Sequence, residues 1–229
     1  MAIPKVIHRI WFGPRPMPQS YRSYGHDWIE LNPGWKLIDW NYDTLPELIN
    51  QHWFDTCGTA WRPGRGDAKE ATMIQVTQAD IASYEILHQH GGLYVNCDMQ
   101  PISPLPDLTD VDALLAYEID GWLISNAFMA ATPNHPLMQS VINAIPGSIQ
   151  ANQQASMDWI TGPKLLTAVK KELHDDVFVL PARACNPFMP DQQPVVYPET
   201  ICQHHWGHAA KDEELWPDLP RQEGQQRYN

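Results

Sequence analysis

Two polar residues near the middle of the chain have the types and the spacing to bind a metal ion. Asn96 and Asp98 end an apolar segment typical of a buried strand, where side chains two positions apart share a face. An amide and a carboxylate placed in this way supply the oxygen ligands that Mg²⁺ and Mn²⁺ prefer. Taken alone, the motif is also typical of an acid that ends a strand and caps the proline-rich turn after it. Asp98 is therefore a candidate ligand, and the structural interpretation stays open.

A second group of possible metal ligands lies near the C-terminus. It consists of Cys202, His204, His205 and His208. One interpretation is a zinc site, which would make the chain a zinc-dependent hydrolase, although no partner pair stands at the usual zinc-finger spacing. The other interpretation is a solvated, histidine-rich loop.

The composition indicates one folded domain that does not bind nucleic acid. The chain has 229 residues, of which 43% are hydrophobic and 18% are charged. We expect a single domain over residues 1–210, followed by a polar tail over 211–229. The formal net charge of −12 argues against a nucleic-acid partner, because phosphate backbones require clustered Lys and Arg. For the same reason, a phosphate-bearing substrate would need a metal ion or a local basic pocket.

The sequence favours a cytoplasmic protein without a transmembrane segment. No apolar run approaches the roughly 18 residues of a membrane-spanning helix. The first residues also lack the basic and then apolar pattern of a secretory signal. No Cys-x-x-Cys pair occurs, so we expect the cysteines to be reduced thiols: Cys57, Cys97, Cys185 and Cys202.

The elements that must position the candidate residues alternate between strand and helix. Apolar patterning predicts strands over residues 6–12, 35–40, 93–99, 113–119, 127–131 and 177–180. It predicts helices over 20–31, 67–90, 135–145 and 163–174, with Gly91 and Gly92 ending the second and Thr161 capping the last. Such alternation is typical of a three-layer α/β fold with a mostly parallel sheet. In these folds, ligands bind beyond the carboxyl ends of the strands.

Several weak motifs follow one another in a characteristic order. They are an opening strand at 3–11, a helix with two glycines at 80–92, an Asn-x-Asp strand at 94–98, and blocks at 126–136, 161–163 and 204–206. Their order and spacing cover residues 3 to 208 and resemble glycosyltransferase family 32, the DXD-containing sugar transferases. This family includes yeast initiating mannosyltransferases and bacterial capsular polysaccharide transferases. The glucosyltransferase domains of clostridial toxins are more distant relatives.

The resemblance implies a GT-A-type nucleotide-sugar-binding fold, with a mostly parallel central sheet flanked by helices. It also implies a metal-dependent hexosyltransferase that uses Mn²⁺ or Mg²⁺ and retains the anomeric configuration. The donor would be a UDP- or GDP-sugar. The acceptor would be a hydroxyl group of a glycan, a lipid-linked molecule or a protein.

The resemblance assigns roles to residues of the donor site. Trp11 matches the aromatic residue that stacks on the nucleobase, and Arg9 and Ile10 are donor-binding candidates on the same strand. Asp80 matches the aspartate that hydrogen-bonds the transferred sugar, and Asn126 is a candidate contact of that sugar or of the acceptor. From the residues alone, Trp11 is also consistent with a core tryptophan, and Asp80 with an acid near a helix N-terminus.

The resemblance also assigns the metal site. The second aspartate of the family motif is the direct metal ligand, and Asp98 matches it. Asn96 stands in place of the first aspartate and can hydrogen-bond ribose or sugar hydroxyls through its amide. His205 matches a ligand or near neighbour of the same cation. The catalytic candidates are therefore Asp80, Asn96 and Asp98, and the metal-binding candidates are Asp98 and His205.

Two departures from the family pattern leave an alternative function. Ser83 stands three positions after the helix aspartate, where the family usually carries an arginine beside the donor. Arg9, Arg15 or Lys164 would have to supply that charge instead. Together with Asn96, this departure is also consistent with a catalytically degenerate relative that binds a nucleotide sugar or a glycan without turnover.

Overall fold

The computed structural model describes residues 2–61, 70–153, 155–173, 177–190 and 192–207. The strands are β1 (Val6–Ile10), β2 (Lys36–Trp40), β3 (Gly92–Val95), β4 (Met99–Pro101), β5 (Ala113–Ile119), β6 (Leu123–Ala131), β7 (Phe178–Leu180) and β8 (Cys202–His204). The helices are α1 (Gln19–Leu31), α2 (Gln51–Asp55), α3 (Glu70–His90), α4 (Pro136–Asn152), α5 (Met157–Ile160), α6 (Pro163–Glu172) and α7 (Ala182–Cys185). The predicted tail over 211–229 and His208 lie outside the described residues.

The central sheet is mostly parallel, and this prediction is confirmed. Its strand order is β2-β1-β3-β6-β5-β7, and only β6 runs against the others. The reversal arises because β5 and β6 form a hairpin, so the strand expected over 127–131 begins earlier, at Leu123. The carboxyl ends of β1, β3 and β5 therefore meet at one edge of the sheet, where α/β folds bind ligands.

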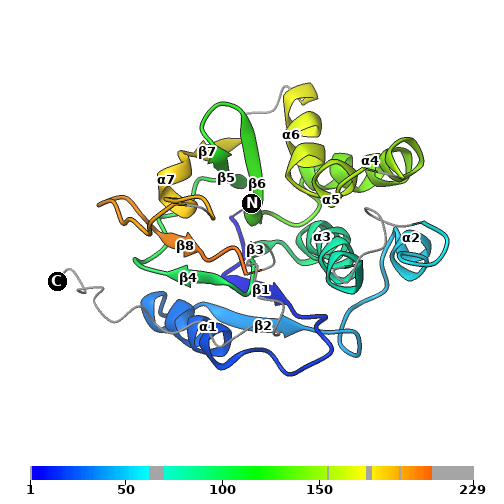
Figure 1. The fold of residues 1–229 in the computed structure, drawn as a ribbon. Coiled ribbons are helices and arrows are strands. Elements are labelled where there is room, and N and C mark those ends of the chain that lie inside the picture. The colour runs from blue at the N-terminus through cyan, green and yellow to red at the C-terminus, as the bar shows by residue number, and fades with distance from the viewer. Residues whose placement is uncertain (1, 62–69, 154, 174–176, 191, 208–229) are drawn as a thin grey trace.

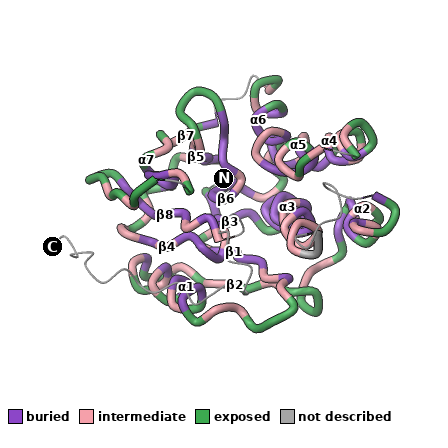
Figure 2. The backbone as a smooth tube through the Cα atoms, in the orientation of Figure 1, coloured by how far each residue is buried: buried purple, intermediate pink, exposed green. Residues whose placement is uncertain are grey.

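Helices cover both faces of this sheet, as expected for a three-layer fold (Figure 1). Helices α2 to α6 lie on one side, and α1, α7 and the small β4-β8 sheet lie on the other. Neighbouring residues on the central strands belong to two different cores: Leu93 and Leu114 face α1 and α7, whereas Tyr94 and Leu115 face α3 and α4. This alternation follows the two-residue period of a strand. Figure 2 shows the buried sheet enclosed by more exposed outer elements.

A pair of glycines joins α3 to β3, as predicted. Gly91 and Gly92 both have positive φ, of 63° and 103°, and the Gly91 amide donates to the Leu87 carbonyl oxygen at the end of the helix. A Cβ atom on Gly92 would lie 2.5 Å from the Val6 carbonyl oxygen. Glycine is therefore required here both for the left-handed backbone and for the close approach of β1.

The strand expected over 93–99 is shorter than predicted. β3 ends at Val95, and the Met99 amide then donates to the Asn96 carbonyl oxygen to close a turn. The chain continues as β4, which pairs with β8 in a separate antiparallel sheet. Asn and Asp favour turns because their side chains stabilise local backbone bends. Asn96 and Asp98 thus lie in a turn between two sheets and not on a continuous strand.

None of the helices within the described ranges combines the length and the apolar character needed to cross a bilayer.

Candidate active site

A pocket opens at the carboxyl ends of β1 and β3, beside α3. It brings together five residues that the sequence predicted for the donor and metal sites, together with residues of the β1–α1 loop, α1 and α3. The five predicted residues are Ile10, Trp11, Asp80, Asn96 and Asp98. They come from three separate segments of the chain, so the fold gathers an aromatic side chain, an amide and two carboxylates around one cavity.

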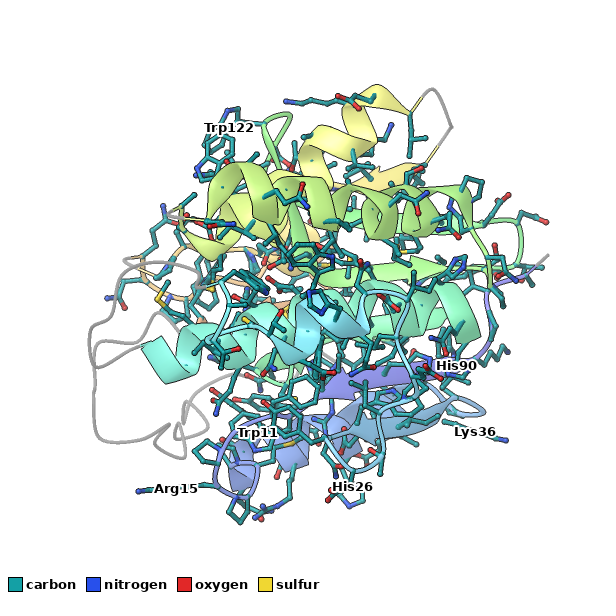
Figure 3. All side chains as sticks on the ribbon, turned by 90° about the vertical axis from the view of Figure 1, so that its right-hand side faces the viewer. Trp11, Arg15, His26, Lys36, His90 and Trp122 are labelled. Atoms are coloured by element: carbon teal, nitrogen blue, oxygen red, sulfur yellow. The ribbon has the colours of Figure 1, made fainter. Side chains whose placement is uncertain are left out.

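Trp11 lies in the loop after β1, and Figure 3 shows its position. Its Nε1 donates to the Arg15 carbonyl oxygen at 2.7 Å, and its ring meets the Tyr21 ring edge to face, with centroids 6.1 Å apart. A Cβ atom on Gly13 would lie 2.6 Å from the indole, so only glycine lets the ring occupy this place. The half-buried indole is therefore fixed in the wall of the pocket, where a planar ligand could stack on it.

Asp80 is held by hydrogen bonds from two distant segments. Its Oδ1 accepts from Asn126 Nδ2 at 2.8 Å, and its Oδ2 accepts from Thr161 Oγ1 at 2.9 Å. Asp80 lies in the middle of α3, because the helix begins at Glu70, so the interpretation as an acid near a helix N-terminus is wrong. Burial raises the pKa of Asp80 to about 7, while the two hydrogen bonds act in the opposite direction.

Asn96 and Asp98 occupy different environments within the turn. Asn96 Oδ1 accepts a hydrogen bond from the Tyr94 hydroxyl at 3.0 Å. Asp98 is buried, and its Oδ2 accepts from the Gly207 amide at 2.7 Å. Its Oδ1 lies 3.3 Å from His204 Nε2. The end of β8 and the segment after it therefore pack against the Asp98 carboxylate.

The histidine beside the Asp98 carboxylate is His204. His205 Nε2 instead shares a hydrogen bond with Gln100 Oε1 at 2.9 Å, and its ring stacks on Tyr24 with centroids 5.5 Å apart. Only the backbone amide of His205 reaches Asp98, where it donates to the carbonyl oxygen at 3.1 Å. The assignment of His205 as a metal ligand thus stays a prediction, and His204, another member of the C-terminal group of possible ligands, is the histidine that lies beside Asp98.

The described residues contain no group of three or more His, Cys, Asp or Glu side chains placed to hold one metal ion. A cation at Asp98 would consequently take further ligands from a substrate or from water. Among the described residues, the pocket lining also includes no Lys or Arg. A diphosphate placed beside two carboxylates in such a pocket would be repelled unless a cation accompanied it.

The three cations proposed to replace the missing arginine lie elsewhere. Lys164 Nζ sits over the Trp159 ring, 4.5 Å from its centroid. Arg15 is exposed and points away from the body of the molecule (Figure 3). Arg9 is buried, and its guanidinium makes a bidentate pair with Asp39 at 2.7 and 2.8 Å. Ser83 does not contribute charge either.

The Arg9–Asp39 pair is expected to stabilise the fold in an asymmetric way. Arg9 is 1% exposed and Asp39 is 42% exposed. We therefore expect Asp39→Ala to cost about 1–3 kcal/mol, because the buried guanidinium loses its charged partner and keeps only the Tyr21 carbonyl oxygen and the Met17 sulfur as acceptors. Arg9→Met should cost less, because the remaining carboxylate is partly solvated. Urea unfolding of both variants measures their free energies of unfolding and shows which substitution costs more. A folded Arg9→Met protein that no longer binds nucleotide would instead support the donor-binding role of Arg9.

Thr161 was predicted to cap the helix that begins at Pro163, and this prediction is wrong. Gly162 is the N-cap of α6, and no side chain caps the helix. The Thr161 hydroxyl donates to Asp80 instead, across 81 residues of sequence. No local pattern in the sequence indicates such a contact.

Comparisons with known proteins point to sugar transferases. Residues 18–129 match the family model described as the glycosyltransferase sugar-binding region containing a DXD motif. The chain is 26% identical over 167 residues to an uncharacterised glycosyltransferase of Acanthamoeba polyphaga mimivirus, covering 71% of this chain and 62% of that protein. It is also 26% identical over 154 residues to inositol phosphoceramide mannosyltransferase 3 of Schizosaccharomyces pombe, covering 63% and 38%. The chain thus spans less than two thirds of these curated relatives.

Two solved structures share the fold. One is the PaToxG glycosyltransferase, with a TM-score of 0.58 and 15% identity over 73% of this chain and 68% of that one. The other is the UDP-bound glycosyltransferase domain from the YGT toxin, with a TM-score of 0.53 and 12% identity over 79% of both chains. Identities this low show the fold alone. The shared fold confirms the GT-A-type architecture. In its motif region, its curated relatives and its fold, the chain is similar to the DXD-containing glycosyltransferases.

Proposed function

We propose that this protein transfers a hexose from a nucleoside diphosphate sugar to a hydroxyl group, with retention of configuration. The observation that carries the proposal is the convergence of Trp11, Asp80 and Asp98 on one pocket at the edge of a GT-A-type sheet. A nucleoside diphosphate is favoured because one structural neighbour is described as UDP-bound. The name of the fission-yeast relative supports a mannose donor and a lipid-linked acceptor as one specific case. A glycan and a protein are the other acceptor classes.

The side chains around Asp98 fit Mn²⁺ or Mg²⁺. The Asp98 carboxylate and the Asn96 amide are hard oxygen donors, and the His204 imidazole adds a nitrogen donor that suits Mn²⁺. When bound there, the cation would supply Lewis-acid stabilisation of the departing diphosphate. The Gly207 amide donates to one oxygen of the Asp98 carboxylate, so the orientation of this carboxylate is fixed before any ligand arrives.

The remaining residues of the pocket bind and orient the donor. Trp11 offers its indole to the nucleobase. Asp80, when ionised, accepts hydrogen bonds from hydroxyls of the transferred sugar. Asn126 holds Asp80 from β6 and is itself a candidate contact of the sugar. No nucleophilic side chain is assigned, in keeping with a reaction in which the leaving group assists the attack on the same face of the sugar.

A second function has one specific observation in its favour. The Ser83 hydroxyl donates to the Asp80 carbonyl oxygen at 2.8 Å, so the position of the family's arginine is occupied by a side chain bonded to its own helix. A pocket without that cation is consistent with a degenerate relative that binds a nucleotide sugar or a glycan without turnover.

We also propose a cytoplasmic location. The four cysteines are buried free thiols, as is usual in a reducing compartment. Fractionation of the native source, followed by detection of the protein in each fraction, tests this location.

A donor panel tests the proposed reaction directly. The purified protein is incubated with UDP- and GDP-sugars, with Mn²⁺ or with a chelator, and release of nucleoside diphosphate is measured. Metal-dependent turnover of one donor supports the transferase. Binding of a donor without turnover, in the presence of candidate acceptors, supports the degenerate relative. Absence of both binding and turnover for every donor contradicts the assignment.

Trp11 is expected to contribute strongly to nucleotide affinity. Trp11→Ala should raise the Kd of the nucleoside diphosphate about 10- to 100-fold, because aromatic stacking on a base contributes about 1–3 kcal/mol. Trp11→Phe keeps a ring and should lie between this variant and the wild type. Isothermal titration calorimetry measures each affinity. An unchanged Kd in Trp11→Ala would place the nucleobase away from this loop.

A further inference from the structure

The Asp80 carboxylate is surrounded by three elements that meet at this point. Asp80 belongs to α3, Asn126 reaches it from β6, and Thr161 reaches it from the turn between α5 and α6. Thr161 is fully buried, so its hydroxyl does not exchange between this carboxylate and solvent. The α5–α6 turn therefore acts directly on a residue of the donor pocket.

The position of the Thr161 hydroxyl is fixed by its own backbone. The Thr161 amide donates to the Met157 carbonyl oxygen at 3.0 Å. The Thr161 carbonyl oxygen accepts from the Tyr84 hydroxyl at 2.8 Å. Asp80 and Tyr84 are four residues apart and share one face of α3. One helix face thus binds Thr161 at both its side chain and its carbonyl group, which leaves the hydroxyl little freedom to move.

Each oxygen of the Asp80 carboxylate accepts one hydrogen bond: Oδ1 from Asn126 and Oδ2 from Thr161. A carboxylate oxygen has two acceptor sites, so each oxygen keeps a site for a ligand hydroxyl. Rotation of the carboxylate would break both bonds at once. The pair of donors therefore fixes the plane of the carboxylate, and with it the direction in which the remaining acceptor sites point.

We propose that Thr161 is a positioning residue for the transferred sugar, because its hydroxyl holds the Asp80 carboxylate in the orientation that accepts the sugar hydroxyls. This inference rests on the proposed function. Thr161 acts through Asp80 and does not itself need to touch the donor.

The hydrogen bond from Thr161 also affects the pKa of Asp80 and therefore the pH dependence of the reaction. Burial raises the pKa of Asp80, the hydrogen bonds from Thr161 and Asn126 lower it, and the Asp158 charge on α5 raises it. Among the described residues, Cys57, Tyr84 and Tyr94 also lie within reach of the Asp80 charge. Burial is the main cause that raises the pKa of each, and the Asp80 charge raises it further. Loss of the Thr161 hydroxyl removes stabilisation of the ionised carboxylate, so the pKa of Asp80 rises further.

Two variants of Thr161 separate positioning from packing. Thr161→Val keeps the shape and removes the donor, and Thr161→Ser keeps the donor and removes a methyl group. With the donor identified in the panel above, we expect Thr161→Val to lower kcat/KM at pH 7 about 10- to 100-fold. We expect Thr161→Ser to stay within about threefold of the wild type. In Thr161→Val, the acidic limb of the pH–rate profile should move to higher pH.

A binding measurement gives a readout that does not depend on turnover. The Kd of the nucleotide sugar should rise in Thr161→Val, whereas the Kd of the corresponding nucleoside diphosphate should not change, because only the sugar reaches Asp80. Equal effects on both ligands, or equal impairment of the Ser and Val variants, would reduce Thr161 to a packing role and overturn the proposal. If Thr161→Val does not fold, Thr161→Ala removes the same donor.

The wild-type protein distinguishes failure of this inference from failure of the proposed function. If the wild type binds the nucleotide sugar and Thr161→Val binds it equally well, only the positioning role is wrong. If the wild type neither binds nor turns over any donor of the panel, the proposed function is wrong and this inference is wrong with it.

Discussion

Asp98→Asn is expected to lower metal-dependent turnover of the nucleotide sugar about 10³-fold, a larger effect than we expect for Trp11→Ala, Asp80→Asn or Thr161→Val. The reason is that an amide binds a divalent cation much less strongly than a carboxylate does. Departure of the diphosphate would then lack its compensating charge. The fold should survive, because the new amide oxygen can still accept the hydrogen bond from the Gly207 amide. Turnover with Mn²⁺ and with chelator, for both proteins, measures the effect.

The matched control is Asp120→Asn. Asp120 Oδ1 also accepts a backbone hydrogen bond, from the Ala182 amide at 2.6 Å, but Asp120 does not line the pocket. This variant should keep its turnover and its response to Mn²⁺. Titration of Mn²⁺ followed by electron paramagnetic resonance adds a direct readout, with tight binding expected in the wild type and in the control. Full metal-dependent turnover in Asp98→Asn would rule out Asp98 as an essential ligand.

Asp80→Asn is expected to lose activity and gain stability. Turnover should fall about 10²-fold or more, because the neutral amide cannot accept sugar hydroxyls as a carboxylate does. The hydrogen-bond network can persist: the new amide oxygen accepts from Asn126, and the new amide nitrogen donates to the Thr161 hydroxyl. The variant therefore changes the charge at this position and largely keeps the packing.

The gain in stability should depend on pH. Burial raises the pKa of Asp80 from 3.8 to about 7, so the folded protein binds this proton more tightly than the unfolded chain does. The stabilisation from the protonated carboxyl is complete below about pH 4 and is lost as the pH rises through about 7. The amide mimics the protonated form at every pH. The advantage of Asp80→Asn should therefore be greatest near pH 8, at about 1–2 kcal/mol after allowance for solvent screening, and decrease towards pH 4.

Thermal unfolding of Asp80→Asn and the wild type across pH 4 to 8 tests this prediction. Glu85→Gln is the control on the same helix. Glu85 is buried and accepts from the backbone amides of Ile49 and Asn50, and it does not line the pocket. We expect this variant to change stability and to keep the turnover of the folded protein. A destabilised Asp80→Asn protein at pH 8 would mean that the ionised carboxylate is favourable in the folded state.

The sequence by itself predicted the strands of the central sheet, the four longest helices and the edge of the sheet at which the pocket lies. Apolar periodicity indicates which side chains are buried, and Gly91 and Gly92 require the left-handed backbone that ends α3. In an α/β fold, the carboxyl ends of parallel strands meet at one edge. Trp11, Asn96 and Asp98 follow β1 and β3, so their convergence on one cavity could be anticipated from the strand assignment and the family motifs.

Only the tertiary structure decided which side chains act on one another. The Thr161 hydroxyl reaches Asp80, and His204 rather than His205 lies beside the Asp98 carboxylate. Arg9 is paired with Asp39 on the neighbouring strand and does not line the pocket. These contacts depend on the packing of α5 against α3, on the register of β8 against β4 and on the pairing of β1 with β2. Local patterning fixes the face on which a residue lies, but it carries no information about the partner that a distant segment brings to that face.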